Sequence, residues 1–109
     1  MDDRTMNRLK GLMGLCVRAR QAIFGEDACL RAIREEKAEL LLLDNGISKS
    51  NGRKYETLGK LKDVPVIRLR SGLLEESTGR PGRAMAVRGG SLAEEILNCL
   101  QASQPETDA

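Results

Sequence analysis

The segment over residues 18–44 constrains the fold more than any other part of the sequence. Its pattern predicts a basic lead-in, a very short strand, a hinge at Gly25, an amphipathic helix and a fully apolar strand, in that order. This order places a helix N-terminus, with its unpaired backbone N–H groups, at an exposed corner beside Arg18, Arg20 and Arg31. Such a corner can hold an anionic backbone while neighbouring side chains contact the groups attached to it.

Helices and strands alternate along the rest of the chain, whose 109 residues fit one domain. Apolar spacing predicts helices over residues 6–18, 26–36, 48–61 and 72–77 and from residue 91, and strands over residues 22–24, 40–43, 64–69 and 84–87. Ser71 is expected to cap the fourth helix. The pattern predicts a single-domain α/β sandwich with helices on both faces of a sheet. We expect residues 1–5 to form a loose leader, residues 6–101 the domain and residues 102–109 a flexible tail.

The charges of the chain are segregated along the sequence. The formal net charge is +2, but residues 4–90 hold all 18 Lys and Arg against 10 Asp and Glu, an excess of eight positive charges. The other six acidic residues lie near the two ends. A basic body favours a polyanionic partner, because phosphate contacts release counterions and contribute much of the affinity. The alternative is ordinary surface solvation of Lys and Arg.

The composition argues against several classes of function. The chain has no His, and Cys16, Cys29 and Cys99 are widely separated among apolar neighbours, without a CxxC pair. We therefore expect no catalytic residue, no metal site and no cofactor, and a reduced, cytoplasmic protein. The sequence also lacks a long apolar run, so we expect no membrane partner. Phe24 and Tyr55 are the only aromatic residues, which argues against proteins that stack single-stranded bases.

The strongest candidate site begins at Gly25 and continues along the helix after it. Asp27, Arg31 and Arg34 stand at i, i+4 and i+7, so they form one outward strip. Asp27 could accept hydrogen bonds from a guanine edge, and Arg31 could donate to guanine O6 and N7. The alternative is that Glu26 and Asp27 only complement the helix dipole and that Asp27 pairs with Arg31.

A second candidate is the loop over residues 79–83, Gly-Arg-Pro-Gly-Arg. Its glycines permit a close approach to a ligand, and Arg80 and Arg83 suit phosphate groups. The alternative is an ordinary solvated surface loop. The sequence has no glycine-rich nucleotide-binding motif after a strand, so nucleotide-dependent chemistry is not expected.

The whole pattern resembles the kink-turn-binding ribosomal protein family, and within it the small bacterial YlxQ-type members. The resemblance covers roughly residues 6–100. Its strongest parts are NRLKGLMGLCVR at 7–18, FGED at 24–27, LRAIREEKAELLLLD at 30–44 and VPVIRL at 64–69. The resemblance implies a three-layer α/β/α sandwich around a small mixed four-stranded sheet. It also implies recognition of kink-turns, which are sharply bent duplexes with tandem sheared G·A pairs and a flipped-out base.

RNA-binding members of that family open the second helix with Gly-x-Asn-Glu-x-x-Lys, which reads the G·A pairs. The matching positions here begin at Gly25 and end at Arg31, which keep the glycine and the basic residue. The asparagine is replaced by Asp27, which cannot donate when ionised, and the glutamate by Ala28. The family's second contact, on the flipped base, corresponds to residues 79–85, which are rich in arginine instead of apolar residues. These departures weigh against strict kink-turn specificity more than against binding of structured RNA.

Together these patterns predict a non-catalytic, cytoplasmic RNA-binding protein of the ribosomal type. Its partner is expected to be ribosomal RNA or another structured, kink-turn-like RNA, with ribosome-associated proteins as further candidates. The residues expected at the RNA are Gly25, Glu26, Asp27, Arg31, Arg18, Arg20, Arg34, Arg80 and Arg83. One alternative is a protein–protein adaptor on the same fold that has lost RNA binding, and a more remote one is an enzyme or an accessory domain of one.

Overall fold

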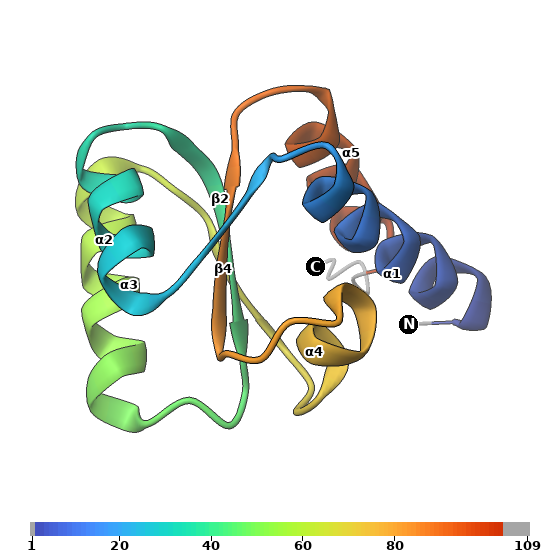
Figure 1. Ribbon diagram of the computed structural model, residues 1–109, viewed down its shortest axis with the longest axis horizontal. Coiled ribbons are helices and arrows are strands. Elements are labelled where there is room, and N and C mark those ends of the chain that lie inside the picture. Colours follow the sequence, from blue (N-terminus) through green and yellow to red (C-terminus); the bar gives the residue numbers. More distant parts are fainter. Residues whose placement is uncertain (1, 104–109) are drawn as a thin grey trace, which may run out of the picture.

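The chain alternates helices and strands from its first helix to its last. The computed structural model describes residues 2–103, with side chains through residue 101. Its elements are α1 (Asp3–Arg18), β1 (Ala22–Phe24), α2 (Glu26–Arg34), β2 (Ala38–Asp44), α3 (Lys49–Lys62), β3 (Val66–Leu69), α4 (Leu73–Thr78), β4 (Ala84–Arg88) and α5 (Ser91–Ser103). Helices α2 and α3 cover one face of the sheet, and α1, α4 and α5 cover the other (Figure 1). The predicted α/β/α sandwich is therefore confirmed.

The four strands form one mixed sheet in the order β1-β4-β2-β3. Strands β2 and β3 are parallel, whereas β4 runs antiparallel to both of its neighbours, β1 and β2. Consequently β1, β2 and β3 all end at one edge, where β4 begins. We call this the carboxyl edge, and the opposite one the amino edge. In open α/β sheets, ligands bind most often beside the carboxyl ends of the strands.

Strand β2 separates two apolar cores. Its leucines alternate, with Leu40 and Leu42 in the core beneath α1, α4 and α5, and Leu41 and Leu43 in the core beneath α2 and α3. All four side chains are fully buried. This agrees with the prediction of a central strand covered on both faces, because side chains of a strand point alternately to its two sides.

The ends of the domain differ from the prediction. Helix α1 begins at Asp3, because the Asp2 carboxylate accepts a hydrogen bond from the Thr5 N–H at 2.8 Å and caps the first turn. A loose leader over residues 1–5 is therefore wrong from Asp3 onward. Helix α5 continues to Ser103, so the first two residues of the predicted tail are helical. Residues 104–109 of that tail lie outside the described residues.

Several boundaries inside the domain also differ from the prediction, among them the end of α2 at Arg34 and the start of β2 at Ala38. Helix α4 is preceded by Gly72, with φ 90° and ψ −19°, and not capped by Ser71 as predicted. The reason is that the Gly72 N–H donates to a carboxylate at the end of β2. Strand β3 begins at Val66 and not at Val64, because the Val64 N–H donates to the Gly59 carbonyl at 2.8 Å and thereby closes the end of α3.

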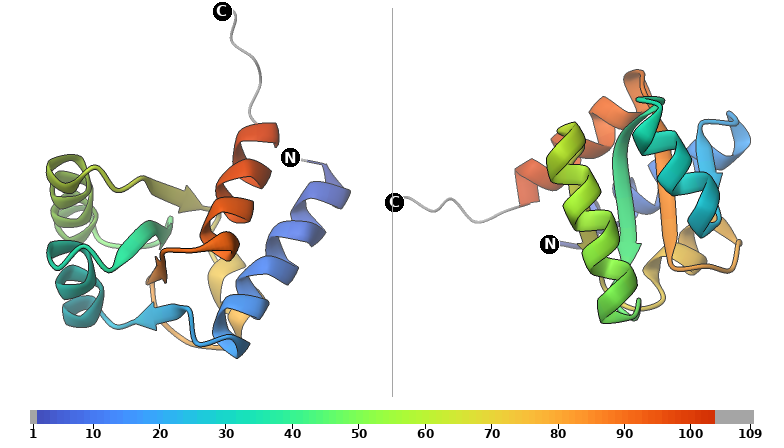
Figure 2. Two further views of the ribbon diagram at one scale, coloured as in Figure 1. Left: turned by 90° about the horizontal axis from the view of Figure 1, so that it is seen from above. Right: turned by 90° about the vertical axis from the view of Figure 1, so that its left-hand side faces the viewer.

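Figure 2 shows the first and last helices, α1 and α5, side by side on one layer and the pair α2 and α3 on the other. The Cys99 thiol of α5 donates to the Thr5 carbonyl of α1 at 3.6 Å. Within the described part of the chain, none of the helices combines the length and the apolar character needed to span a bilayer.

Candidate functional site

Three loops meet at the carboxyl edge and enclose a hollow of about 320 Å³. They are the β1–α2 junction at Gly25, the β2–α3 turn at Gly46 and Ile47, and the α4–β4 loop at Pro81 and Gly82. These segments are distant in sequence, and the sheet order brings them together because β1, β4 and β2 are neighbours. This edge therefore contains a concave site that no single segment could form.

Gly25 opens α2 beside the hollow. Its backbone has φ 98° and ψ 139°, a conformation that residues with a Cβ rarely adopt. The space around the position that a Cβ would take is open, so conformation and not crowding requires the glycine. No side chain caps this helix start. The first N–H groups of α2 thus carry the positive end of the helix dipole toward the exterior.

Helix α3 also begins at this edge. The Ser48 hydroxyl accepts from the Asn51 N–H at 3.2 Å and caps it. One turn later, the buried Tyr55 side chain reaches across, and its hydroxyl donates to the Glu26 carbonyl at 3.4 Å. This bond ties the beginning of α3 to the beginning of α2. Two helix N-termini are therefore held side by side along the hollow.

Asp44 joins the loops of the carboxyl edge to one another. Among the described residues it is the one buried charged or polar side chain, at 5% exposure. One carboxylate oxygen accepts from the Gly46 N–H at 2.7 Å, and the other accepts from the Gly72 N–H at 2.9 Å. The Arg83 guanidinium pairs with the first oxygen at 3.3 Å. Three separate loops are thereby fixed to the end of the central strand.

These partners also decide the charge state of Asp44. Burial by itself raises the pKa of this carboxyl group, but the N–H donors of Gly72 and Gly46, followed by the Arg83 charge, more than offset it. The net result is a pKa below the ordinary value of 3.8. Asp44 is therefore ionised at neutral pH and acts as a fixed negative acceptor.

Arg83 supports the loops as well as facing outward. While it pairs with Asp44, 59% of its side chain remains exposed. A Cβ on Gly46 would overlap with the Arg83 guanidinium, so the glycine leaves the space that this contact needs. The predicted phosphate contact of Arg83 would therefore come from a side chain that is already held in place.

Arg80, in the same loop, lies over the ring of Phe24, with 4.6 Å between the guanidinium carbon and the ring centroid. A cation–π contact of this kind holds the loop against the end of β1. Phe24 directly precedes Gly25, but its ring packs with the core beneath α1, α4 and α5, and Arg80 is not among the residues that line the hollow. Arg80 forms no ion pair within residues 2–101. Its charge thus remains available to a ligand.

The outward strip of α2 is present. Asp27 and Arg31 are both exposed, and no ion pair joins them in the part of the chain that the structure describes. Glu26 instead lies 3.9 Å from the Lys54 ammonium of α3. The alternative in which Asp27 forms an ion pair with Arg31 is therefore not observed in the structure.

Two of the predicted arginines do not lie at the corner. Arg20 follows α1 at the amino edge, where the neighbouring Gln21 carbonyl accepts from the Arg88 N–H at the far end of β4. Strand β1 thus separates Arg20 from Gly25. Arg18 ends α1 near the same edge, and its guanidinium lies back against Gly14. The expectation that both flank the helix N-terminus is wrong, because β1 carries the chain across the sheet before α2 begins.

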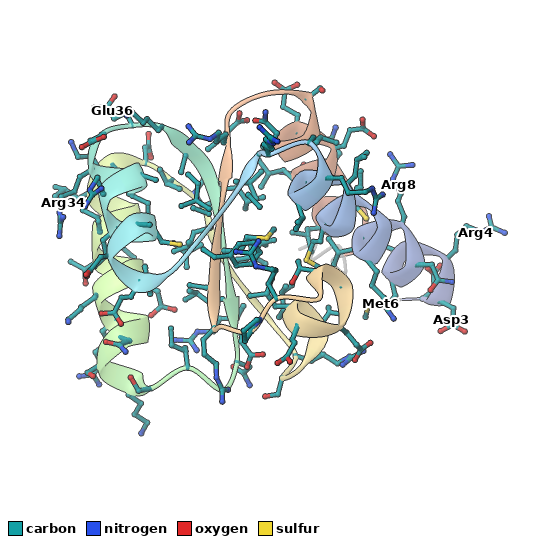
Figure 3. All side chains as sticks on the ribbon, in the orientation of Figure 1. Asp3, Arg4, Met6, Arg8, Arg34 and Glu36 are labelled. Carbon is teal, nitrogen blue, oxygen red and sulfur yellow. The ribbon has the colours of Figure 1, made fainter. Side chains whose placement is uncertain are left out.

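Arg34 is also remote from the hollow. It is the last residue of α2, about 13 Å along the helix axis from Gly25. Figure 3 shows its side chain on the outer side of α2, away from the sheet. The corner therefore combines Gly25, Glu26, Arg80 and Arg83 with the adjoining strip of Asp27 and Arg31.

Sequence reasoning missed the two residues that assemble this corner. They are Asp44, which holds three loops, and Tyr55, which ties α3 to α2. A signal was present for Asp44, because a single carboxylate directly after four leucines must find partners or remain at the surface. Within the described residues, no three His, Cys, Asp or Glu side chains gather in a way that could hold a metal ion.

The fold is shared with solved structures of very different sequence. A protein of unknown function from Bacillus halodurans superposes with a TM-score of 0.80 at 20% identity, covering 85% of this chain and 96% of that one. The Giardia lamblia 15.5kD RNA binding protein superposes with a TM-score of 0.75 at 13% identity, covering 94% of this chain and 89% of that one. These similarities define the α/β class of the domain.

Sequence comparison identifies the family. The chain is 31% identical over 91 residues to the RNA-binding protein YlxQ of Bacillus subtilis, covering 82% of this chain and 91% of that protein. It is 25% identical over 102 residues to the RNA-binding protein YlxQ of Enterococcus faecium, covering 93% and 99%. No protein-family model matches the chain. The chain belongs to the YlxQ family, as its resemblance predicts.

Proposed function

We propose that this protein binds structured RNA through the corner at its carboxyl edge, without catalysing a reaction. The observation that carries the proposal is the hollow between the Gly25 helix start and the arginine-containing loop. Helix N–H groups and the Arg83 guanidinium supply positive charge along it, and Arg80 lies in the same loop as Arg83. The YlxQ proteins of Bacillus subtilis and Enterococcus faecium are named as RNA-binding, which supports the same partner here.

Helix α2 supplies the groups that would read the bases. Its first turn can enter a groove with the N–H groups of Gly25 and Glu26 near the phosphates, while Arg31 reaches a guanine edge. Asp27 accepts from base N–H groups, as its ionised carboxylate has no proton to donate. Because Ala28 offers no polar group, we expect the contact to a sheared G·A pair to be made by Asp27 and Arg31.

The hollow gives the RNA a second place to bind. Family resemblance assigns the loop before the last strand to a flipped-out base, and here this loop forms one wall of the hollow. Ile47, Tyr55 and Ala84 supply apolar lining, and Arg83 supplies donors. We propose that an unstacked base of a kink-turn-like RNA occupies this space, and that ribosomal or other cytoplasmic RNA carries it.

A titration with two matched RNAs tests the proposal. One RNA contains a kink-turn, and the other replaces its tandem G·A pairs by Watson–Crick pairs and its bulge by paired nucleotides. We expect tighter binding of the kink-turn RNA, with an affinity for both RNAs that decreases as salt is raised. Equal affinity for the two RNAs would contradict the use of the hollow and the strip, while leaving general RNA binding intact.

The adaptor function remains the second candidate, and the observation in its favour is Ala28 at the position of a base-reading glutamate. Failure to bind several structured RNAs at physiological salt, together with specific recovery of a protein partner, would favour it. Crosslinking in cells followed by sequencing of the attached RNA would identify the natural RNA, if RNA is the partner. Detected turnover by the purified protein would contradict the non-catalytic function.

A further inference from the structure

A second surface lies on the outer layer, between the helices α2 and α3. The two helices leave a groove of about 540 Å³ between them. The residues of the groove that matter here are Arg34, Arg53, Lys54, Thr57, Leu58 and Leu61. None of them lines the hollow at the carboxyl edge. The groove and the hollow are therefore lined by different residues, although Lys54 of the groove pairs with Glu26 of the hollow.

The floor of this groove is apolar and accessible. Leu61 is 76% exposed, the most exposed large hydrophobic residue of the described chain. Leu58 lies one turn before it and is half-buried against the core below. A single exposed leucine is common on protein surfaces, but here it continues a groove with the Thr57 methyl group and Leu58. Covering this strip would remove apolar surface from water.

The rim of the groove is positively charged. Arg34 and Arg53 form no ion pair among the side chains that the structure describes, and both are exposed. Lys54 has only a long contact of 3.9 Å, to Glu26. Figure 3 shows Arg34 projecting outward from α2, on the side away from the sheet. Among the described residues, Arg34 and Arg53 thus have no acidic partner, and the partner of Lys54 is distant.

We propose that the groove between α2 and α3 docks an acidic amphipathic helix of a partner protein. Carboxylates of the partner would complement the positive charges of the rim, and its apolar side chains would pack on Leu58 and Leu61. A phosphate backbone would meet the cations but would gain nothing from covering leucines. The groove follows α3 from Ser50 to Leu61, about 16 Å, which corresponds to three turns of a docked helix. This partner is additional to the RNA of the proposed function.

A peptide titration of the full chain tests this proposal. The probe is a synthetic helical peptide of about 14 residues, with leucines at i, i+3, i+4 and i+7 and glutamates on both flanks. One counterpart replaces its glutamates with lysines, and the other replaces its leucines with serines. Fluorescence anisotropy should show the acidic peptide binding at least about tenfold more tightly than either counterpart.

Protein variants locate the contact. Leu61→Ser and Arg53→Glu should each weaken the acidic peptide about tenfold. Their matched controls are Leu15→Ser, at the other exposed leucine, and Arg4→Glu, an exposed arginine of α1, and neither should change the affinity more than about twofold. Circular dichroism checks that all four variants fold.

Three outcomes would overturn the proposal. They are equal binding of all three peptides, equal weakening by the control variants, and a loss of affinity for the kink-turn RNA in Leu61→Ser without a change for the peptide. The last would assign the groove to RNA. If no variant or wild-type protein bound RNA but the peptide results held, the proposed function would fail and the docking surface would stand.

Discussion

The two edges of the sheet both carry basic side chains but are built in opposite ways. Helices α2, α3 and α4 begin at the carboxyl edge, whereas α1, α2 and α3 end at the amino edge, where α5 begins. The amino edge also has a hollow, of about 340 Å³, lined by Lys37, Glu39 and Lys62 among others. The positive ends of two long helices, α2 and α3, point toward the first hollow, and their negative ends lie near the second.

This difference changes what a cation does at each edge. Arg18 and Lys62 lie in the last turns of α1 and α3, where a positive charge compensates the negative end of the helix dipole. Arg83 lies beside the starts of α2 and α3, where its charge adds to the dipoles, whereas Arg80 follows the end of the short helix α4. Counting arginines therefore does not locate an anion site, but strand and helix direction do.

The backbone differs in the same way. Of the described residues, the three non-glycine ones with positive φ are Arg20, Glu36 and Asp63, and all lie at the amino edge, after helices. At the carboxyl edge the described residues with positive φ are all glycines, Gly25, Gly72, Gly79 and Gly82, while Gly90 is a glycine with positive φ at the amino edge. A side chain is thus tolerated after the ends of α1, α2 and α3, although the left-handed conformation costs about 1–2 kcal/mol.

The largest expected change in the free energy of unfolding is at Asp44, compared with a carboxylate at the other edge. Asp44→Asn removes the charge that holds Gly46, Gly72 and Arg83, and should lower the free energy of unfolding by about 2–3 kcal/mol. Glu39→Gln is the matched change at the amino edge, where the half-buried side chain accepts from the Gly90 N–H at 3.1 Å. It should change stability by less than about 0.5 kcal/mol in urea unfolding. Equal effects would contradict the special role of Asp44.

The same carboxylate predicts a pH dependence. The pKa of Asp44 is lowered in the folded protein below its ordinary value of 3.8, so its stabilising contribution is fully present above about pH 4. It is lost as the pH falls through the folded-state pKa, since the unfolded chain then binds the proton more readily. The stability difference between wild type and Asp44→Asn should therefore shrink between neutral and acidic unfolding curves. A difference that stays constant with pH would show that the carboxylate charge is not what matters.

The next largest effect is expected on RNA affinity, which should depend on the carboxyl edge more than on the amino edge. Arg31→Ala should weaken binding of the kink-turn RNA by about 1–3 kcal/mol if Arg31 reads a guanine through two hydrogen bonds. Arg20→Ala removes another exposed arginine, at the amino edge, and should weaken binding by less than about 0.5 kcal/mol at the same salt concentration. A larger loss for Arg20 than for Arg31 would move the RNA site to the amino edge.

The smallest expected changes in stability come from substitutions at two positions with positive φ. Gly25→Ala should destabilise the protein by about 1 kcal/mol, because the alanine must adopt φ 98°. Asp63→Gly, at φ 63° after α3, should stabilise it by about 0.5 kcal/mol, because the strain of the left-handed residue is relieved. Thermal unfolding measures both. A stabilising Gly25→Ala would show that the glycine is not needed for the start of α2.

The sequence was sufficient for the elements but not for their arrangement around the site. Residues 40–43 predicted a buried strand and Gly25 a helix start, because burial and backbone conformation are encoded locally. The strand order β1-β4-β2-β3 is not encoded in any one segment. For this reason Arg20, only five residues before Gly25, was expected at the corner but lies at the opposite edge. The contact of Arg80 with Phe24 and the bonds of Asp44 likewise join residues that are far apart in sequence.

Four consecutive leucines give β2 no unique alignment of their own, since a shift by one residue would still present leucine to both layers. The frame of the strand must therefore be fixed where the leucines stop. A register shift that moved Asp44 inward by one position would bury its charge without a partner among apolar side chains. A shift outward would take it away from Gly72 and Arg83. Asp44, which holds the three loops together, thus also fixes the alignment of the leucine-rich strand β2.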